Sequence, residues 1–219
     1  VPSGDTAACS AQLGSVALGA SRTVTIGGPT ELNTLAMARA LIVIVGSADA
    51  NDGELVAAEL QALPPHMLQI MLDAGSRVAV CRRDVTDYRT DLRGVQPRNW
   101  PDGQTWADAA GLNSSSRNEV VIATQGHGTA EGAHAPRTGE RNGSHNTVLH
   151  EAAHNVDANS PDHANSQSED FNNARDADHA TLSDYERHDT DAGREETYAE
   201  SAARHYGGDA NDSTDHPNL

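Results

Sequence analysis

The chain has 219 residues, 37% hydrophobic and only 3% aromatic, which suits one domain with a largely aliphatic core. The 32 acidic residues outnumber the 15 basic residues and give a formal net charge of -17, whereas nucleic-acid binding requires a basic surface. No apolar stretch reaches the roughly 18 residues of a membrane span. We therefore expect no nucleic-acid partner and no membrane span.

Composition divides the chain into three parts. Residues 1–29, with scattered Gly, Ser and Thr, predict an extended or weakly ordered lead-in, residues 30–206 form the main domain, and residues 207–219 predict a disordered tail. The chain begins at Val1 without a targeting segment, which we interpret as a processed mature form or an excised domain, and we expect secretion. Cys9 and Cys81 lack the spacing of a zinc ribbon, and either a disulfide or two free thiols fits them.

The first half of the domain predicts helices and one ambiguous apolar run. Thr30 is a candidate helix cap, and the run over 41–45 suits either the continuation of that helix or a strand. Helical spacing over 52–63 ends at Pro64-Pro65, and a second helix follows over 67–72.

The second half predicts two strands and two further helices. Residues 77–81 and 120–123 are β-branched strands. Between them, residues 94–112 predict a loop that Trp100 and Trp106 pack onto the body of the protein. Helices are expected over 146–157 and 192–206, on either side of a stretch crowded with Asp, Asn, Ser and His.

The helix over 146–157 contains an HExxH sequence formed by His150, Glu151 and His154. Residues at positions i and i+4 lie on one helix face, so both imidazoles can bind one Zn²⁺. Glu151 then reaches water at the metal as the general base of a hydrolase. The alternative is an exposed polar helix that binds no metal.

A catalytic zinc site also needs a third protein ligand. The helix over 192–206 offers Glu196 and Glu200 on one face, so that one can bind the metal while the other orients a histidine. Glu195 points elsewhere. The alternative is a solvated acidic helix.

Several segments in this order resemble the protease domain of the anthrax lethal factor and the secreted Pro-Pro endopeptidases. They are HEAAHNVD, LQALPPHMLQIMLDAGSRVAV, GVQPRNWPDGQTWADAAGL, EVVIAT and REETYAES. The resemblance implies that His150, His154 and Glu196 are zinc ligands and that Glu151 is the general base. Glu200 matches a further glutamate of the family.

The family also uses a tyrosine before the glutamate ligand to stabilise the oxyanion. Tyr185 is the candidate, although it lies further upstream than the family pattern, and Asp189 stands in strict register. An insertion after Tyr185 would reconcile the two patterns. His188 is the alternative donor, and Tyr185 also suits a purely structural role.

We therefore expect an α+β zincin-like metallopeptidase domain, with a small twisted sheet, an active-site helix and a helical C-terminal lobe. The expected function is that of a monomeric, secreted zinc endopeptidase acting on extended, including proline-rich, protein segments. The strand over 120–124 is a candidate edge for a peptide substrate. The alternatives are a non-catalytic acidic module that binds metal or protein, and a zinc amidase acting on cell-wall peptides.

Overall fold

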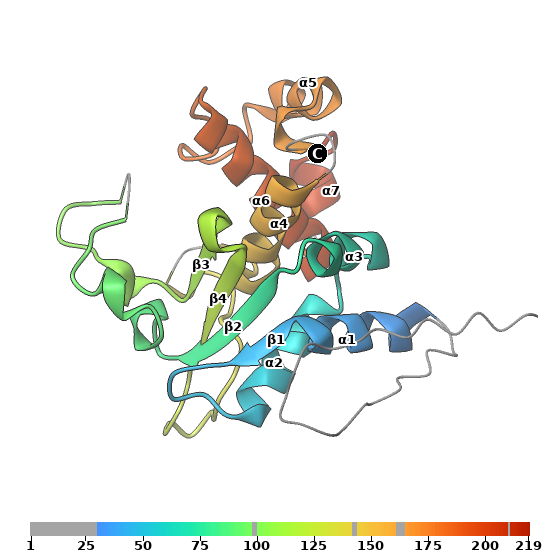
Figure 1. Ribbon diagram of the computed structural model, residues 1–219. Helices are drawn as coiled ribbons and strands as arrows, with labels where there is room; N and C mark the ends of the chain where they lie inside the picture. Colours follow the sequence, from blue (N-terminus) through green and yellow to red (C-terminus); the bar gives the residue numbers. More distant parts are fainter. Residues whose placement is uncertain (1–29, 98–99, 142–143, 161–164, 210) are drawn as a thin grey trace, which may run out of the picture.

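The computed structural model describes residues 30–97, 100–141, 144–160, 165–209 and 211–219 (Figure 1). The predicted lead-in over 1–29 lies outside the described residues. In chain order the helices are α1 (Thr30–Leu41), α2 (Ala50–Leu60), α3 (Pro65–Asp73), α4 (Thr147–Asn159), α5 (Glu169–Asp178), α6 (Asp191–Gly207) and α7 (Asp212–Asp215); the strands are β1 (Ile42–Ile44), β2 (Arg77–Arg82), β3 (Gly111–Ser114) and β4 (Glu119–Thr124). None of the described helices is long and apolar enough to cross a membrane.

The four strands form one sheet in the order β1-β2-β4-β3. Strands β1, β2 and β4 are parallel, and β3 runs antiparallel to β4. The expectation that residues 120–124 form an edge is wrong, because β4 is paired on both sides. The edge strand next to β4 is β3, which the sequence does not reveal because its residues Gly-Leu-Asn-Ser contain a single large apolar side chain.

The two faces of the sheet are covered differently. Helices α1 to α4 pack against one face, where they meet Val78, Val80, Val120 and Ile122. The loop between β2 and β3 covers the other face and brings Trp100 against it, as predicted. Covering on both faces explains why β2 and β4 read as continuous apolar runs rather than alternating ones.

The run over 41–45, which the sequence leaves open, contains both structures. Helix α1 continues through Leu41, and β1 begins at Ile42. The predicted break between the next two helices is confirmed, since α2 ends at Leu60 and α3 begins at Pro65. Pro65 occupies the first helical position, where the missing N–H costs no hydrogen bond.

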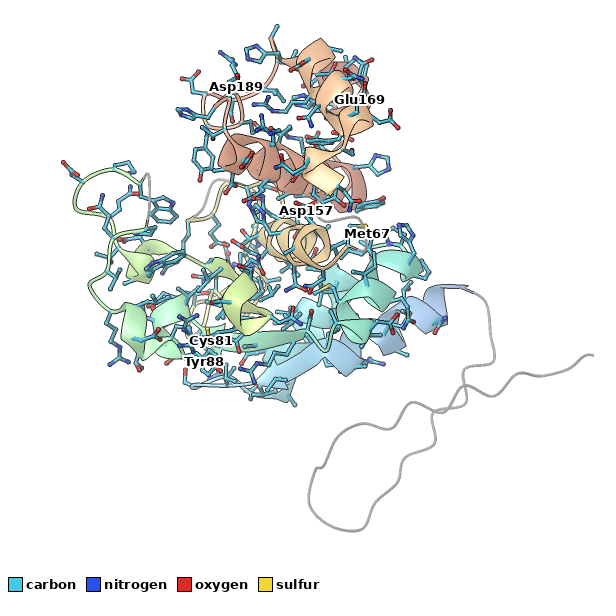
Figure 2. All side chains as sticks on the ribbon, turned by 45° about the horizontal axis from the view of Figure 1, so that its top comes forward. Met67, Cys81, Tyr88, Asp157, Glu169 and Asp189 are labelled. Atoms are coloured by element: carbon cyan, nitrogen blue, oxygen red, sulfur yellow. The ribbon has the colours of Figure 1, made fainter. Side chains whose placement is uncertain are left out.

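The C-terminal lobe contains α5, α6 and α7, and Figure 2 shows the part with Glu169 and Asp189 at the far end of the molecule from Cys81. Residues 211–219 do not form the expected disordered tail. The buried Asp178 carboxylate accepts hydrogen bonds from the backbone N–H groups of Asn218 (2.8 Å) and Leu219 (3.0 Å), which docks the chain end onto α5. This anchor depends on a contact between distant residues, which the residue composition of the segment does not predict.

A buried carboxylate joins α2 to the sheet. Asp52 is fully buried and accepts hydrogen bonds from Arg82 Nε (2.8 Å) and Thr124 Oγ1 (2.8 Å), while His127 Nε2 lies 3.0 Å away. Burial alone raises the pKa of Asp52, but hydrogen bonds from the Asp49 backbone, Thr124 and Arg82 outweigh it and lower the pKa. Asp52 is therefore charged in the folded protein and ties α2 to both β2 and β4.

We expect Asp52→Ala to lower the free energy of unfolding by about 3 kcal/mol, because it leaves buried donors without their acceptor. Folding lowers the pKa of Asp52, so the stability that its carboxylate contributes is present above about pH 4. This stability is lost as the pH falls through the pKa that Asp52 has in the folded protein. Urea unfolding at pH 7 and pH 3 checks both statements. Glu54→Ala is the control, because the Glu54–Arg39 pair is more than half exposed and should contribute little to the free energy of unfolding. Equal losses for the two variants would contradict the assignment.

Cys81 is fully buried on β2 and is a free thiol, whereas Cys9 lies outside the described residues. Burial, followed by the charges of Asp87 and Asp84, raises the pKa of the Cys81 thiol to about 12. We expect Cys81 to resist iodoacetamide in the native protein at pH 8 and to react after unfolding without reductant. Peptide mass spectrometry reads out the labelling, and reaction only after reduction would instead indicate a disulfide.

Candidate metal centre

Helix α4 presents His150, Glu151 and His154 at the bottom of a cleft. Its opposite face is held in the core by Leu149 and Val156. The Asn146 side chain caps the helix by accepting a hydrogen bond from the Leu149 backbone N–H at 3.1 Å. The two imidazoles therefore project from a rigid element.

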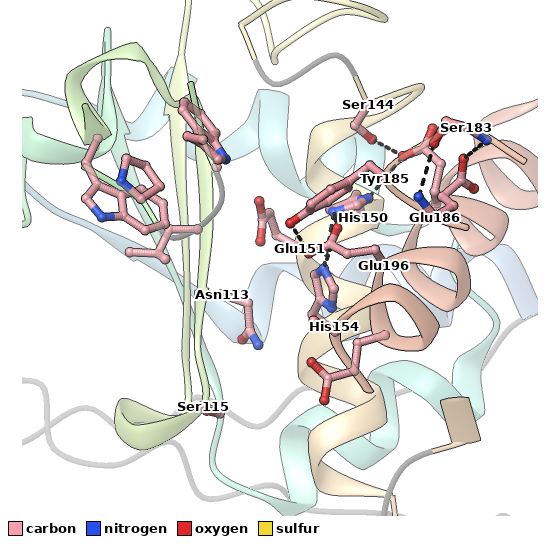
Figure 3. A pocket seen from close by; sticks show the side chains of 18 of the residues that line it. Asn113, Ser115, Ser144, His150, Glu151, His154, Ser183, Tyr185, Glu186 and Glu196 are labelled. Carbon is pink, nitrogen blue, oxygen red and sulfur yellow. Dashed lines mark hydrogen bonds and ion pairs between the residues drawn. The ribbon is translucent and has the colours of Figure 1, made fainter. Parts of the chain in front are cut away.

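Helix α6 supplies the carboxylate that meets them. Ala153 of α4 packs against Ala199 and Ala202 of α6, and these small side chains let the two helices approach closely. The Glu196 carboxylate then lies against both histidines (Figure 3). Among the described residues, His150, His154 and Glu196 are the group whose donor atoms converge as a metal site requires.

The spacing of these donors fits Zn²⁺. Four ligands at 2.0–2.1 Å in a tetrahedron lie about 3.3 Å from one another. Here the two Nε2 atoms are 3.2 Å apart, and Glu196 Oε2 lies 3.3 Å from His150 Nε2 and 3.5 Å from His154 Nε2. The three residues predicted as ligands are thus arranged as three corners of such a tetrahedron, and they would hold the ion.

Glu200 orients His150 from behind. Its Oε2 lies 3.0 Å from His150 Nδ1 and 2.8 Å from Ser144 Oγ, while Oε1 accepts the backbone N–H of His145 at 2.8 Å. A carboxylate beside Nδ1 places the hydrogen on that nitrogen and leaves Nε2 free to bind metal. Burial alone lowers the pKa of His150, but hydrogen bonds to Glu196 and Glu200 outweigh it and raise the pKa.

Glu151 faces the edge strand β3 and is only 6% exposed. Gly111 makes this approach possible, because a Cβ there would lie 2.7 Å from Glu151 Cγ. Burial raises the pKa of Glu151, and the neighbouring His150 and His154 oppose this rise. The carboxylate therefore lies beside the donor group without belonging to it.

Tyr185 enters from the C-terminal lobe, and its hydroxyl donates to Glu196 Oε1 at 3.3 Å. Residues 186–190 form a turn that folds back and accommodates the extra sequence between this tyrosine and Glu196. His188 and Asp189 do not line the cleft, and Asp189 pairs with Arg194 instead. Of the three candidates, Tyr185 is the one that lines the cleft.

The cleft itself has a volume of about 620 Å³. One wall comes from α4 and α6, and the other from β3 and the loop that carries Trp100 and Trp106, whose ring centroids are 6.2 Å apart. The tryptophans therefore both pack on the sheet and line the cleft. Asn113, Ser144, Glu186 and Arg204 also line it, and nothing in the sequence singles them out because their position depends on how distant segments pack.

Comparisons with known proteins bear on the family and the fold of the chain. The family model for the anthrax toxin lethal factor N- and C-terminal domain matches residues 36–213. The structure of the Pro-Pro endopeptidase PPEP-2 from Paenibacillus alvei superposes with a TM-score of 0.67 at 21% identity, covering 83% of this chain and 95% of that one. A search of curated proteins finds no match. The structural likeness establishes the zincin-like α+β fold that the sequence predicts.

We expect the purified chain to bind one Zn²⁺. Of the three variants compared, Glu196→Ala should lower the zinc affinity most, since that change removes a donor atom. Glu200→Ala should lower the affinity by about 10–100-fold, because His150 loses the partner that orients it. Glu169→Ala is the control, as Glu169 is exposed on α5 and lies outside both the cleft and the donor group. Competition titration with a chelator measures all three, and equal effects of Glu169→Ala and Glu196→Ala would contradict the assignment.

Proposed function

We propose that this chain, which belongs to the anthrax toxin lethal factor family, is a zinc-dependent endopeptidase that hydrolyses peptide bonds in extended protein segments. The observation that carries the proposal is the convergence of His150, His154 and Glu196 at the spacing of zinc ligands. Glu151 follows the first ligand directly and faces the same cleft. Two nitrogen donors, one carboxylate and an adjacent free carboxylate form the set that a zinc peptidase needs.

Zinc, when bound, polarises a carbonyl group and makes water a stronger acid. The residues of the chain supply the proton transfers. Glu151 accepts a proton from water as the water oxygen attacks the peptide carbonyl, and it passes this proton to the amine nitrogen as the C–N bond breaks. The Tyr185 hydroxyl, which lies on Glu196 in the same cleft, donates a hydrogen bond to the oxyanion in this proposal.

The edge strand β3 supports an extended substrate. It is paired with β4 on one side, and Leu112 and Asn113 line the cleft. A peptide that pairs with a strand edge is bound through its internal backbone rather than through its end. This mode favours an endopeptidase over an exopeptidase.

The opposite wall supports proline-rich segments as one substrate class. Trp100 and Trp106 expose ring surface to the cleft beside Pro97, and such apolar faces suit the rings of proline residues. Secretion and a monomeric state are further parts of the proposal. Cell fractionation and light scattering, respectively, would check them.

We expect Glu151→Gln to retain zinc but to lower kcat by about 10²–10⁴-fold, the usual contribution of a general base. Incubation of the zinc-loaded protein with a proline-enriched peptide library, followed by mass spectrometry, reads out cleavage and its sequence preference. Glu131→Gln, on an exposed loop, is the control and should leave cleavage unchanged.

Full turnover by Glu151→Gln would overturn the assigned base. A wild-type protein that binds one zinc and cleaves no library peptide would favour a non-catalytic metal-binding or protein-binding module. Cleavage confined to cell-wall peptides would favour the amidase.

A further inference from the structure

The turn that carries Tyr185 is exposed except at one residue. Residues 183–190 form the second part of the connection between α5 and α6, and within this turn Glu186 is only 3% exposed, whereas Tyr185 beside it is 41% exposed. Its hydroxyl reaches Glu196 Oε1 at 3.3 Å, so the conformation of the turn sets where this hydroxyl lies.

The anchor is an ion pair removed from water. Both carboxylate oxygens of Glu186 lie 3.1 Å from Arg204 Nη2, and the two side chains are 4% and 15% exposed. Glu186 Oε2 also accepts the Ser183 backbone N–H at 3.0 Å, which closes the turn around Tyr185. Buried charge pairs of this kind fix geometry, since separating them leaves an uncompensated charge.

The backbone of the turn is held as well. Arg175 of α5 donates to the carbonyl oxygens of Glu186 (2.6 Å) and His188 (3.0 Å). Gly193 packs against the His188 carbonyl, where a Cβ would overlap the oxygen. The region after Tyr185 is thus anchored to two helices, and the Glu186 side chain ties the turn to Arg204 of α6 beside the site.

We propose that Glu186 and Arg204 are positioning residues that hold Tyr185 over Glu196. The same guanidinium faces the metal centre, because Arg204 Nε lies 3.8 Å from Oε1 of Glu200, the carboxylate that orients His150. One arginine on α6 therefore contacts the supports of both the oxyanion donor and a ligand. This inference rests on the proposed peptidase function for its catalytic consequence, but not for the anchoring itself.

The kinetic test uses Glu186→Gln, which removes the charge without touching Glu200. A donor displaced by about 1 Å can cost roughly 10²-fold in rate, so we expect kcat to fall by that factor while KM changes less than about threefold. Zinc affinity should stay the same. In a Tyr185→Phe background the further loss in kcat should be under about twofold, because Glu186 acts through the hydroxyl that is already absent.

Asp184→Asn is the matched control. Asp184 flanks Tyr185 on the other side, is fully exposed, and contacts Arg187 of the same turn, so its loss should leave kcat unchanged. The double variant Glu186→Gln with Arg204→Gln leaves no unpaired buried charge and guards against unfolding. It should show at least this fall in kcat, because Arg204 also contacts Glu200. An unchanged kcat in Glu186→Gln, or full additivity with Tyr185→Phe, would overturn the proposal.

Hydrogen exchange on the zinc-loaded protein separates this inference from the proposed function. In Glu186→Gln we expect faster exchange in the peptide covering residues 183–190 and unchanged exchange in α4. If the wild type cleaves no peptide but this acceleration is seen, the peptidase assignment fails and the anchor stands. Unchanged exchange in 183–190 would overturn the anchor whatever the activity.

Discussion

The close contact between α4 and α6 is the constraint on which the candidate site depends. Ala153, Ala199 and Ala202 let the two helices approach, and only at this distance can the Glu196 carboxylate reach both imidazoles. Neither helix supplies a zinc site alone, because α4 provides two nitrogen donors and the third protein ligand must come from α6. A larger side chain at these alanines would separate the donors before it affected any ligand directly.

The rest of the fold holds these two helices in place from opposite sides. The sheet and helices α1 to α3 pack against the apolar face of α4, and the buried Asp52 ties α2 to β2 and β4. On the other side, the ion pair between Glu186 and Arg204 fixes the turn over α6. The candidate site thus lies in the seam between α4 and α6, with supporting contacts on both sides of it.

The parts of this structure that follow local rules could be predicted from the sequence. His150 and His154 are separated by one helical turn, so their common face is a property of α4 alone, and Glu196 and Glu200 repeat the same logic on α6. The break at Pro64-Pro65 is equally local. Strand β3 could not be found in this way, because four residues with one large apolar side chain carry no period. Helix α5 is hidden likewise in a polar stretch, and the placement of Tyr185 depends on Arg204, 19 positions along the chain.

The ligands come from both sides of the seam, and this has a consequence for the energetics of folding. A bound ion would join residue 150 to residue 196 and close the intervening chain into a loop, much as a covalent cross-link does. Since ligands that bind only the folded state stabilise it by mass action, the cohesion of the two lobes would vary with the free metal concentration around the protein. The stability of the fold as well as its proposed chemistry would then depend on the same ion.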